Sequence, residues 1–167
     1  KQVDCGAAFA SKYAGERILT LDESLALAKG RINLYLDCKA VDPVRLVRAI
    51  LDAGMEHQVV VYDSLTHLRQ VEDIAPGKLA LMAKWHPDRA ISPVLATHHL
   101  AAVEIDANEV TPEVVRSFHA EGANVEVKVL GDWDRPSFWD KALQAHADWL
   151  QTDLPEEIEA HALWQRI

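Results

Sequence analysis

Short apolar segments that have the character of buried strands alternate with amphipathic helical segments along the whole chain of 167 residues. Successive strands are about 20 to 27 residues apart, the length of one strand, one helix and two short loops. Strands that are apolar throughout and alternate with helices are typical of a parallel sheet covered by helices. The sequence therefore predicts an α/β fold. The expected strands are residues 32–37, 58–62, 79–83, 101–105, 124–130 and 148–151.

Local signals mark the helices between these strands. Thr20 and Glu23 have the spacing of a capping box, and Asp42–Pro43 supplies an N-cap and a first-turn proline. In the second of these helices the apolar positions expected on one face are Val44, Val47, Ile50 and Leu51. The expected helices are residues 20–30, 43–54, 64–75, 111–122, 137–147 and 155–166, while residues 86–99 are predicted to be a longer loop with one short helical turn.

Two architectures fit this order of elements, an open doubly wound sheet and a (β/α) barrel. A complete barrel has eight βα units and about 250 residues, whereas only six units are predicted here. No strand is predicted in residues 1–17. We interpret residues 1–167 as one α/β domain, a TIM (β/α)8-type barrel of six βα units whose first two strands are missing from the sequence.

Charge and composition exclude several classes of protein. The net charge of -9 argues against a nucleic-acid partner, which requires a basic face. No apolar run is long enough to span a bilayer, and no signal-peptide pattern is present. Cys5 and Cys38 form no metal-ligand spacing, and we expect Cys38 to be a small core residue. The sequence is compatible with a cytoplasmic location and also, after removal of a signal peptide, with the periplasm or the exterior.

Charged residues at the ends of the predicted strands indicate a binding site. Asp37 and Lys39 lie two residues apart at the end of an apolar strand, so their side chains should point the same way. A carboxylate and an ammonium are costly to bury there without a partner, and we expect a ligand beside them. Lys128 also projects from an apolar strand, toward either the site or a solvated edge. Other strand ends carry Asp63, Lys84, His86, Glu104, Asp106 and Asp153.

Helix capping or a solvated loop position is the favoured interpretation for three of these acids, Asp63, Asp106 and Asp153. His119 and His146 are expected on solvated helix faces or at helix ends. The sequence contains no His-x-x-x-His, Cys-x-x-Cys, P-loop, dinucleotide-binding or Gly-x-Ser-x-Gly pattern. No catalytic residue is therefore assigned from a local motif.

Four segments together resemble the glycerophosphodiester phosphodiesterase family. Residues 14–25 are similar to its Gly-Glu-x-Ile-Pro-Thr-Leu-x-Glu-x-Leu motif, with Leu19 in place of the proline. Residues 34–39 resemble the strand that ends Glu-x-Lys, and residues 122–130 resemble Gly-x-x-Val-x-Val-Trp-Thr. Residues 147–155 resemble Val-Asp-Gly-Ile-x-Thr-Asp-x-Pro. Each motif alone is weak, but their order and spacing are specific and extend over nearly the whole chain.

The resemblance implies a (β/α)8 barrel that hydrolyses glycerophosphodiesters to glycerol 3-phosphate and an alcohol, in bacterial lipid metabolism. It implies a Ca²⁺ or Mg²⁺ ion held by carboxylates, and two histidines as general acid and base. By the same resemblance Asp37 is a metal ligand, and Lys39 faces the phosphate or steadies that ligand. Lys128 takes the place of the family's tryptophan in the substrate wall, where a cation would favour an extra anionic group.

The chain departs from the family pattern at its start. The family's His-Arg-Gly, its Glu-x-Asp metal pair and its second histidine would lie upstream of Lys1, and Asp37 replaces a glutamate. One explanation is an N-terminal segment with two strands outside the written sequence, which we favour because an open barrel would expose two sheet edges. The alternative is a shortened, non-catalytic relative that acts as a binding or scaffolding module. A homo-oligomer, in which a second chain completes the barrel, also fits.

Overall fold

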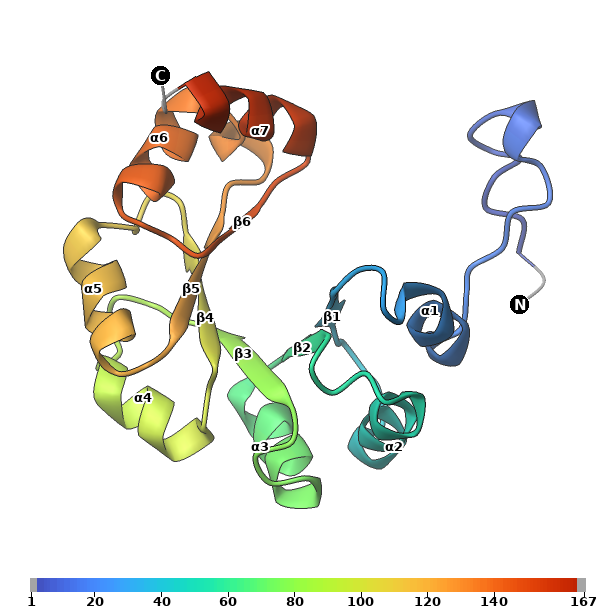
Figure 1. Ribbon diagram of the computed structural model, residues 1–167, viewed down its shortest axis with the longest axis horizontal. Coiled ribbons are helices and arrows are strands. Elements are labelled where there is room, and N and C mark those ends of the chain that lie inside the picture. The colour runs from blue at the N-terminus through green and yellow to red at the C-terminus, as the bar shows by residue number, and fades with distance from the viewer. Residues whose placement is uncertain (1–2, 165–167) are drawn as a thin grey trace.

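The computed structural model describes residues 3–164, which form a six-stranded parallel sheet with helices on its outer side (Figure 1). The spatial order of the strands follows the chain, and all five neighbouring pairs are parallel. Within residues 3–164 the first and last strands have no strand partner at their outer edges. The strands are β1 (Leu34–Asp37), β2 (Val59–Tyr62), β3 (Ala80–Lys84), β4 (Ala102–Asp106), β5 (Asn124–Lys128) and β6 (Trp149–Gln151).

Four of the helices begin at residues whose side chains accept backbone N–H groups. Thr20 forms the predicted capping box with Glu23, and Asp42, Ser64 and Thr111 each cap the helix that follows. The helical elements are η1 (Ser11–Tyr13), α1 (Leu21–Ala28), α2 (Pro43–Ala53), α3 (Leu65–Ile74), α4 (Ile91–His98), α5 (Pro112–Ala120), η2 (Gly131–Trp133), α6 (Pro136–Gln144) and α7 (Pro155–Trp164). The predicted extension of the last helix to Arg166 lies outside the described residues.

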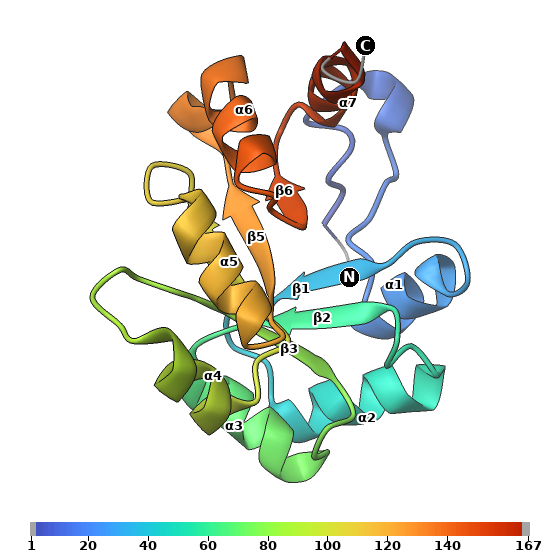
Figure 2. The same ribbon diagram turned by 60° about the vertical axis from the view of Figure 1, so that its left-hand side comes forward.

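The sheet is curled, and the helices lie around its outside (Figures 1 and 2). A doubly wound sheet would have helices on both faces, so that alternative is excluded. The segment that contains η1 extends away from the sheet (Figure 1). The structure thus confirms the predicted α/β fold as part of a TIM-type barrel with six βα units.

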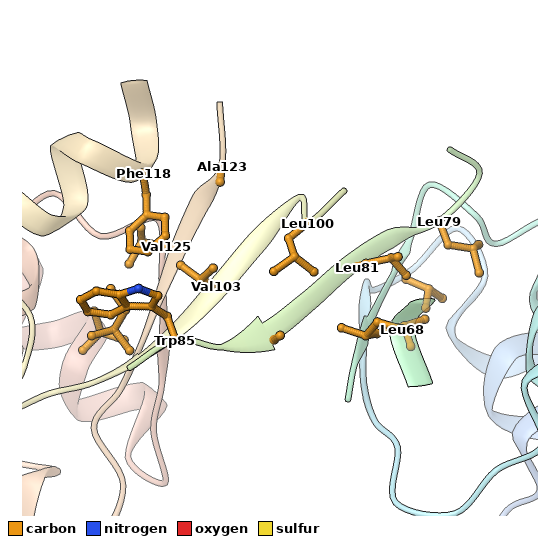
Figure 3. Packing of buried hydrophobic residues seen from close by; sticks show 14 of the residues in the cluster. Leu68, Leu79, Leu81, Trp85, Leu100, Val103, Phe118, Ala123 and Val125 are labelled. Atoms are coloured by element: carbon orange, nitrogen blue, oxygen red, sulfur yellow. The ribbon is translucent and has the colours of Figure 1, made fainter. Parts of the chain in front are cut away.

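One hydrophobic core fills the space between the outer face of the sheet and the helices. Alternate strand residues, such as Val103 and Ile105 of β4, point into this core. Figure 3 shows Trp85 beside Phe118 of α5, with the two rings in an edge-to-face contact and their centroids 5.4 Å apart. Burial of these side chains is the main force that holds the helices on the sheet.

Two details of the predicted helices were wrong. Residues 91–98 form the helix α4, not a loop with one short turn. Its N-cap residue, Ala90, makes no side-chain capping bond, so the local signal is weak, and the helix is held by burial of Leu95 in the core. The buried face of α2 consists of Leu46, Val47 and Ile50, while the predicted Val44 and Leu51 are exposed.

A carboxylate in the loop after β5 holds the end of β6 in place. Asp134 accepts hydrogen bonds from the Trp139 indole at 2.8 Å, the Thr152 hydroxyl at 2.8 Å and the Asp153 backbone N–H at 2.7 Å. Thr152 and Asp153 belong to the Thr-Asp-x-Pro motif found in the sequence. The motif therefore has a structural role, which is to tie the last strand to α6 (Figure 1).

We predict that Asp134→Ala lowers the free energy of unfolding by about 2–3 kcal/mol, because three donors lose their acceptor together. The measurement is urea unfolding followed by circular dichroism. Asp132→Ala is the matched control, since Asp132 lies in the same loop and is exposed. Equal stability of the two variants would contradict this role for Asp134.

Candidate functional site

The face of the sheet opposite the helices, here called the inner face, carries polar and aromatic side chains. These residues alternate along each strand with the residues of the core. Each strand therefore directs its valine and isoleucine side chains toward the helices and its charged side chains toward the inner face. The inner face comprises Tyr35 and Asp37 of β1, Tyr62 of β2, Lys84 of β3, Glu104 and Asp106 of β4, Glu126 and Lys128 of β5, and Trp149 and Gln151 of β6.

A cavity of about 660 Å³ lies at the carboxyl ends of β1, β2 and β3, and we call it the mouth. In α/β barrels this end of the sheet is where substrates bind. Three cationic side chains border it. Lys39 follows β1, Lys84 is the last residue of β3, and Arg89 lies in the loop after β3. The charged and polar residues that line the mouth are Asp37, Lys39, Tyr62, Asp63, Ser64, Thr66, Lys84, His86 and Arg89.

Asp37 and Lys39 lie together at the edge of the mouth, as the sequence predicted. The Lys39 ammonium is 2.6 Å from Asp37 Oδ1, and this hydrogen bond raises the pKa of Lys39. Their side chains are 45% and 76% exposed, so neither charge is buried and burial does not itself demand a ligand. Between them, Cys38 packs against the core, and burial raises the pKa of its thiol to about 11, as expected for a structural cysteine.

Lys84 joins the mouth to the inner face. Its ammonium lies 2.6 Å from Asp106 Oδ2 and 3.7 Å from Glu104 Oε1. Burial opposes the charged ammonium, but the hydrogen bond to Asp106 and the two acids raise the pKa of Lys84 overall. The favoured interpretation of Asp106 as a cap or loop residue was therefore wrong, since Thr111 caps the next helix and Asp106 pairs across strands.

The other two acids have local roles. Asp63 accepts a hydrogen bond from the Ser64 backbone N–H at 2.6 Å, and its second oxygen bonds Nδ1 of His67. Asp153 is exposed, and its backbone N–H donates to Asp134. Asp153 thus has the expected exposed loop position between β6 and α7. For Asp63 the expectation was wrong, because Ser64 caps α3 and the Asp63 side chain is only 11% exposed and pairs with His67.

Two glutamates on the inner face are the most deeply buried charged residues of the described chain. Glu104 and Glu126 are 3% and 4% exposed and face each other in register across β4 and β5. Burial, and then the charge of Glu104, raises the pKa of Glu126 to about 7, while Lys128 opposes the rise. Sequence reasoning missed this pair, although the signal was the one used for Asp37, an acid inside an apolar strand.

Lys128 ends β5 on the inner face, in register with Asp106 and Gln151. It is half-buried and does not border the mouth, whose lining comes from the ends of β1 to β3. Its predicted contact with substrate stays a prediction. Asp37 and Lys39, by contrast, both line the mouth.

The described residues contain no group of three or more histidine, cysteine or acidic side chains arranged to hold a metal ion. Calcium and magnesium require about six oxygen ligands, and Asp37 offers one carboxylate that is already paired with Lys39. The residues present therefore do not make a metal site by themselves. Among residues 3–164, every helix is also too short or too polar to cross a bilayer.

The solved structures similar to this chain include glycerophosphodiester phosphodiesterases. The Agrobacterium tumefaciens enzyme has a TM-score of 0.81 and 23% identity, with 94% of this chain and 68% of that chain covered. For an enzyme from Parabacteroides distasonis the TM-score is 0.73 and the identity 19%, with 87% and 55% covered. An Oleispira antarctica phosphodiesterase in complex with the product sn-glycerol-3-phosphate has a TM-score of 0.69 and 19% identity, with 97% and 68% covered.

These comparisons confirm the predicted resemblance at the level of the fold. The chain spans only 55% to 68% of the length of these three structures, so it matches part of their barrel. No protein-family model matches the chain, and no curated protein matches it by sequence. The activity of this chain must therefore be argued from its own site.

We predict that Glu126→Gln makes the protein more stable at neutral pH. The raised pKa of Glu126 means that its ionisation opposes folding, at a cost that grows from about pH 4.5 and is complete above about pH 7. The variant should therefore gain up to about 3 kcal/mol above pH 7 and nothing below pH 4.5. Urea unfolding across this pH range is the measurement. A difference that does not change with pH would contradict the prediction.

Proposed function

We propose that this chain forms the substrate-binding part of a phosphodiester hydrolase that acts on a glycerophosphodiester and releases glycerol 3-phosphate and an alcohol. The observation that carries the proposal is the mouth, where Lys39, Lys84 and Arg89 border one cavity at the carboxyl ends of the strands. A phosphate group is recognised by such convergent cations. The alcohol group and the setting in bacterial lipid metabolism rest on the family resemblance.

The three cations differ in whether an acidic side chain already pairs with them. Lys39 and Lys84 are each held at 2.6 Å by an aspartate. Arg89 makes no ion pair with the residues that the structure describes. We expect Arg89 to make the first contact and the lysines to turn from their aspartates toward the bound phosphate, with Lys128 near an additional anionic group of the substrate.

The similar structures support this assignment. The Oleispira antarctica phosphodiesterase was solved with the product sn-glycerol-3-phosphate, so a barrel of this kind holds the same phosphate. The sequence resemblance adds Ca²⁺ or Mg²⁺ as a proposed cofactor, with Asp37 as one ligand. Because the described residues do not complete a metal site, its other ligands and the catalytic histidines would come from a segment beyond them.

We predict that sn-glycerol 3-phosphate binds the chain in isothermal titration calorimetry, and that Arg89→Met and Lys84→Met each weaken binding by about tenfold. Each substitution removes a charged donor from the mouth. Lys78→Met is the matched control, because Lys78 is exposed and lies before β3, at the opposite end of the sheet. If Lys84→Met unfolds the protein, Arg89→Met still tests whether the mouth binds the phosphate.

Hydrolysis of a glycerophosphodiester by the same protein is assayed in parallel. Binding accompanied by hydrolysis would support the full proposal. Binding without hydrolysis would restrict the chain to the binding function of a non-catalytic relative. If the control variant loses affinity as much as the mouth variants, or if glycerol 3-phosphate does not bind, the assignment of the mouth is wrong.

We further predict that Ca²⁺ and Mg²⁺ bind this chain only weakly, with a dissociation constant of about 1 mM or more, since one carboxylate and water are a poor ligand set. Calorimetric titration with each ion is the measurement. Asp37→Asn should abolish the binding, while Asp52→Asn, at an exposed position of α2, should leave it unchanged. Tight binding that survives Asp37→Asn would show that Asp37 is not the ligand.

A further inference from the structure

Arg89, one of the three cations of the mouth, lies in an exposed turn between β3 and α4. Its backbone N–H donates to the His86 carbonyl oxygen at 3.0 Å, which closes a turn over residues 86–89. Pro87 occupies the second position of this turn, where its fixed φ angle is favourable. Residues 86–90 are all exposed, so burial of their side chains does not hold the turn in place.

A hydrogen bond from the neighbouring tryptophan holds the turn instead. The Trp85 indole N–H donates to the Arg89 carbonyl oxygen at 3.0 Å. Within the described part of the chain, no other hydrogen bond joins residues 86–89 to a residue outside the turn. The position of the turn, and of the arginine that it carries, therefore depends on this indole.

Trp85 is itself fixed in the interior of the sheet. It follows β3, which lies between β2 and β4, and its backbone N–H donates to the Glu104 carbonyl oxygen at 2.9 Å. Trp85 is 5% exposed, and Figure 3 shows its ring against Phe118 of α5. A buried indole of this kind presents its one donor in a constant direction.

The turn has free space on the side away from the mouth. A cavity of about 590 Å³ is bordered there by Trp85, by Arg89, and by Ser117 and Ala120 of α5. Arg89 thus lies between this cavity and the mouth, which it also borders. Without the indole bond, the exposed turn has room to move away from the mouth.

We propose that Trp85 is a positioning residue for phosphate binding, because its indole N–H fixes the turn that holds Arg89 at the mouth. The inference rests on the proposed function, since it assigns a role at the same phosphate site. Trp85 does not border the mouth and acts only through Arg89. A guanidinium that is already in place loses less conformational entropy on binding, so the indole bond raises affinity without adding a contact to the ligand.

The experiment is calorimetric titration of the purified protein with sn-glycerol 3-phosphate. Trp85→Phe keeps an aromatic ring and removes the indole donor, and we expect it to weaken binding by about fivefold. Trp139→Phe is the matched control. Trp139 is also 5% exposed, and its indole N–H donates to Asp134 at 2.8 Å, outside the mouth. The control variant should bind with the affinity of the unmodified protein.

A double-mutant cycle tests whether Trp85 acts through Arg89. In the Arg89→Met background, Trp85→Phe should weaken binding by less than about twofold, because the side chain that it positions is already absent. Pro87→Gly loosens the same turn and changes no buried residue, and it should weaken binding by about threefold.

Hydrogen exchange of the indole N–H groups, followed by NMR, is a second measurement on the unmodified protein. The two tryptophan variants assign the resonances of Trp85 and Trp139. Glycerol 3-phosphate should slow exchange at Trp85, since a phosphate bound to Arg89 keeps the turn against the indole. Exchange at Trp139 should not change. If Trp85→Phe does not fold, this measurement and Pro87→Gly decide the question.

A loss of affinity in Trp85→Phe that disappears in the Arg89→Met background supports the proposal, as does slower exchange at Trp85. If the unmodified protein binds glycerol 3-phosphate and Trp85→Phe binds it equally well, this inference is overturned and the proposed function stands. An equal loss in both backgrounds, a similar loss in Trp139→Phe, or unchanged exchange at Trp85 also overturns it. If the unmodified protein does not bind the ligand, the proposed function fails, and this inference fails with it.

Discussion

The alternation of side chains along parallel strands is the constraint on which this structure depends. In β4, Val103 and Ile105 point toward the helices, while Glu104 and Asp106 point to the inner face. A shift of one residue in register would place the charges in the core and the apolar residues in the open sheet. The apolar row determines that the helices lie on one face, and the polar row determines what chemistry the other face carries.

The charged residues of the inner face differ in their exposure to solvent, and this difference separates them into two groups. At the strand ends, Asp37 and Lys39 remain exposed, and such a pair is weakly coupled and can exchange its partner for a ligand. Deeper on the inner face, Glu104 and Glu126 are shielded from solvent, so each charge acts on the other and on the tyrosines nearby. Lys128 and Glu126 are neighbours on the same face of β5 and nevertheless belong to these different environments.

The similarity to the three solved phosphodiesterases holds at 23% identity or less. Such a fold tolerates wide changes in sequence because it depends on the pattern of apolar positions, on caps and on loop lengths more than on particular residues. Asp134 is an exception, since its bonds to Trp139 and Thr152 require that carboxylate. Function also depends on particular residues, and the function proposed for this chain rests on the cations of the mouth.

Much of the fold and part of the site could be predicted from the sequence. The order of strands and helices, the caps at Thr20 and Asp42, and the pairing of Asp37 with Lys39 all depend on neighbours within a few residues. Contacts between distant segments could not be predicted in this way. Burial of Leu95 makes a helix where the local signals were weak, and Lys84 turns Asp106 from an expected cap into an ion-pair partner.

The sequence by itself thus determined the elements, their order and the charges at the ends of the strands. The tertiary structure decided which of those charges are shielded from water. Glu126 interrupts an otherwise apolar strand in the sequence, and only the folded sheet, in which β5 lies between β4 and β6, buries its carboxylate and raises its pKa. The reason is physical: the energy of a charge depends on the solvent and the other charges around it, and folding brings those together from distant parts of the chain.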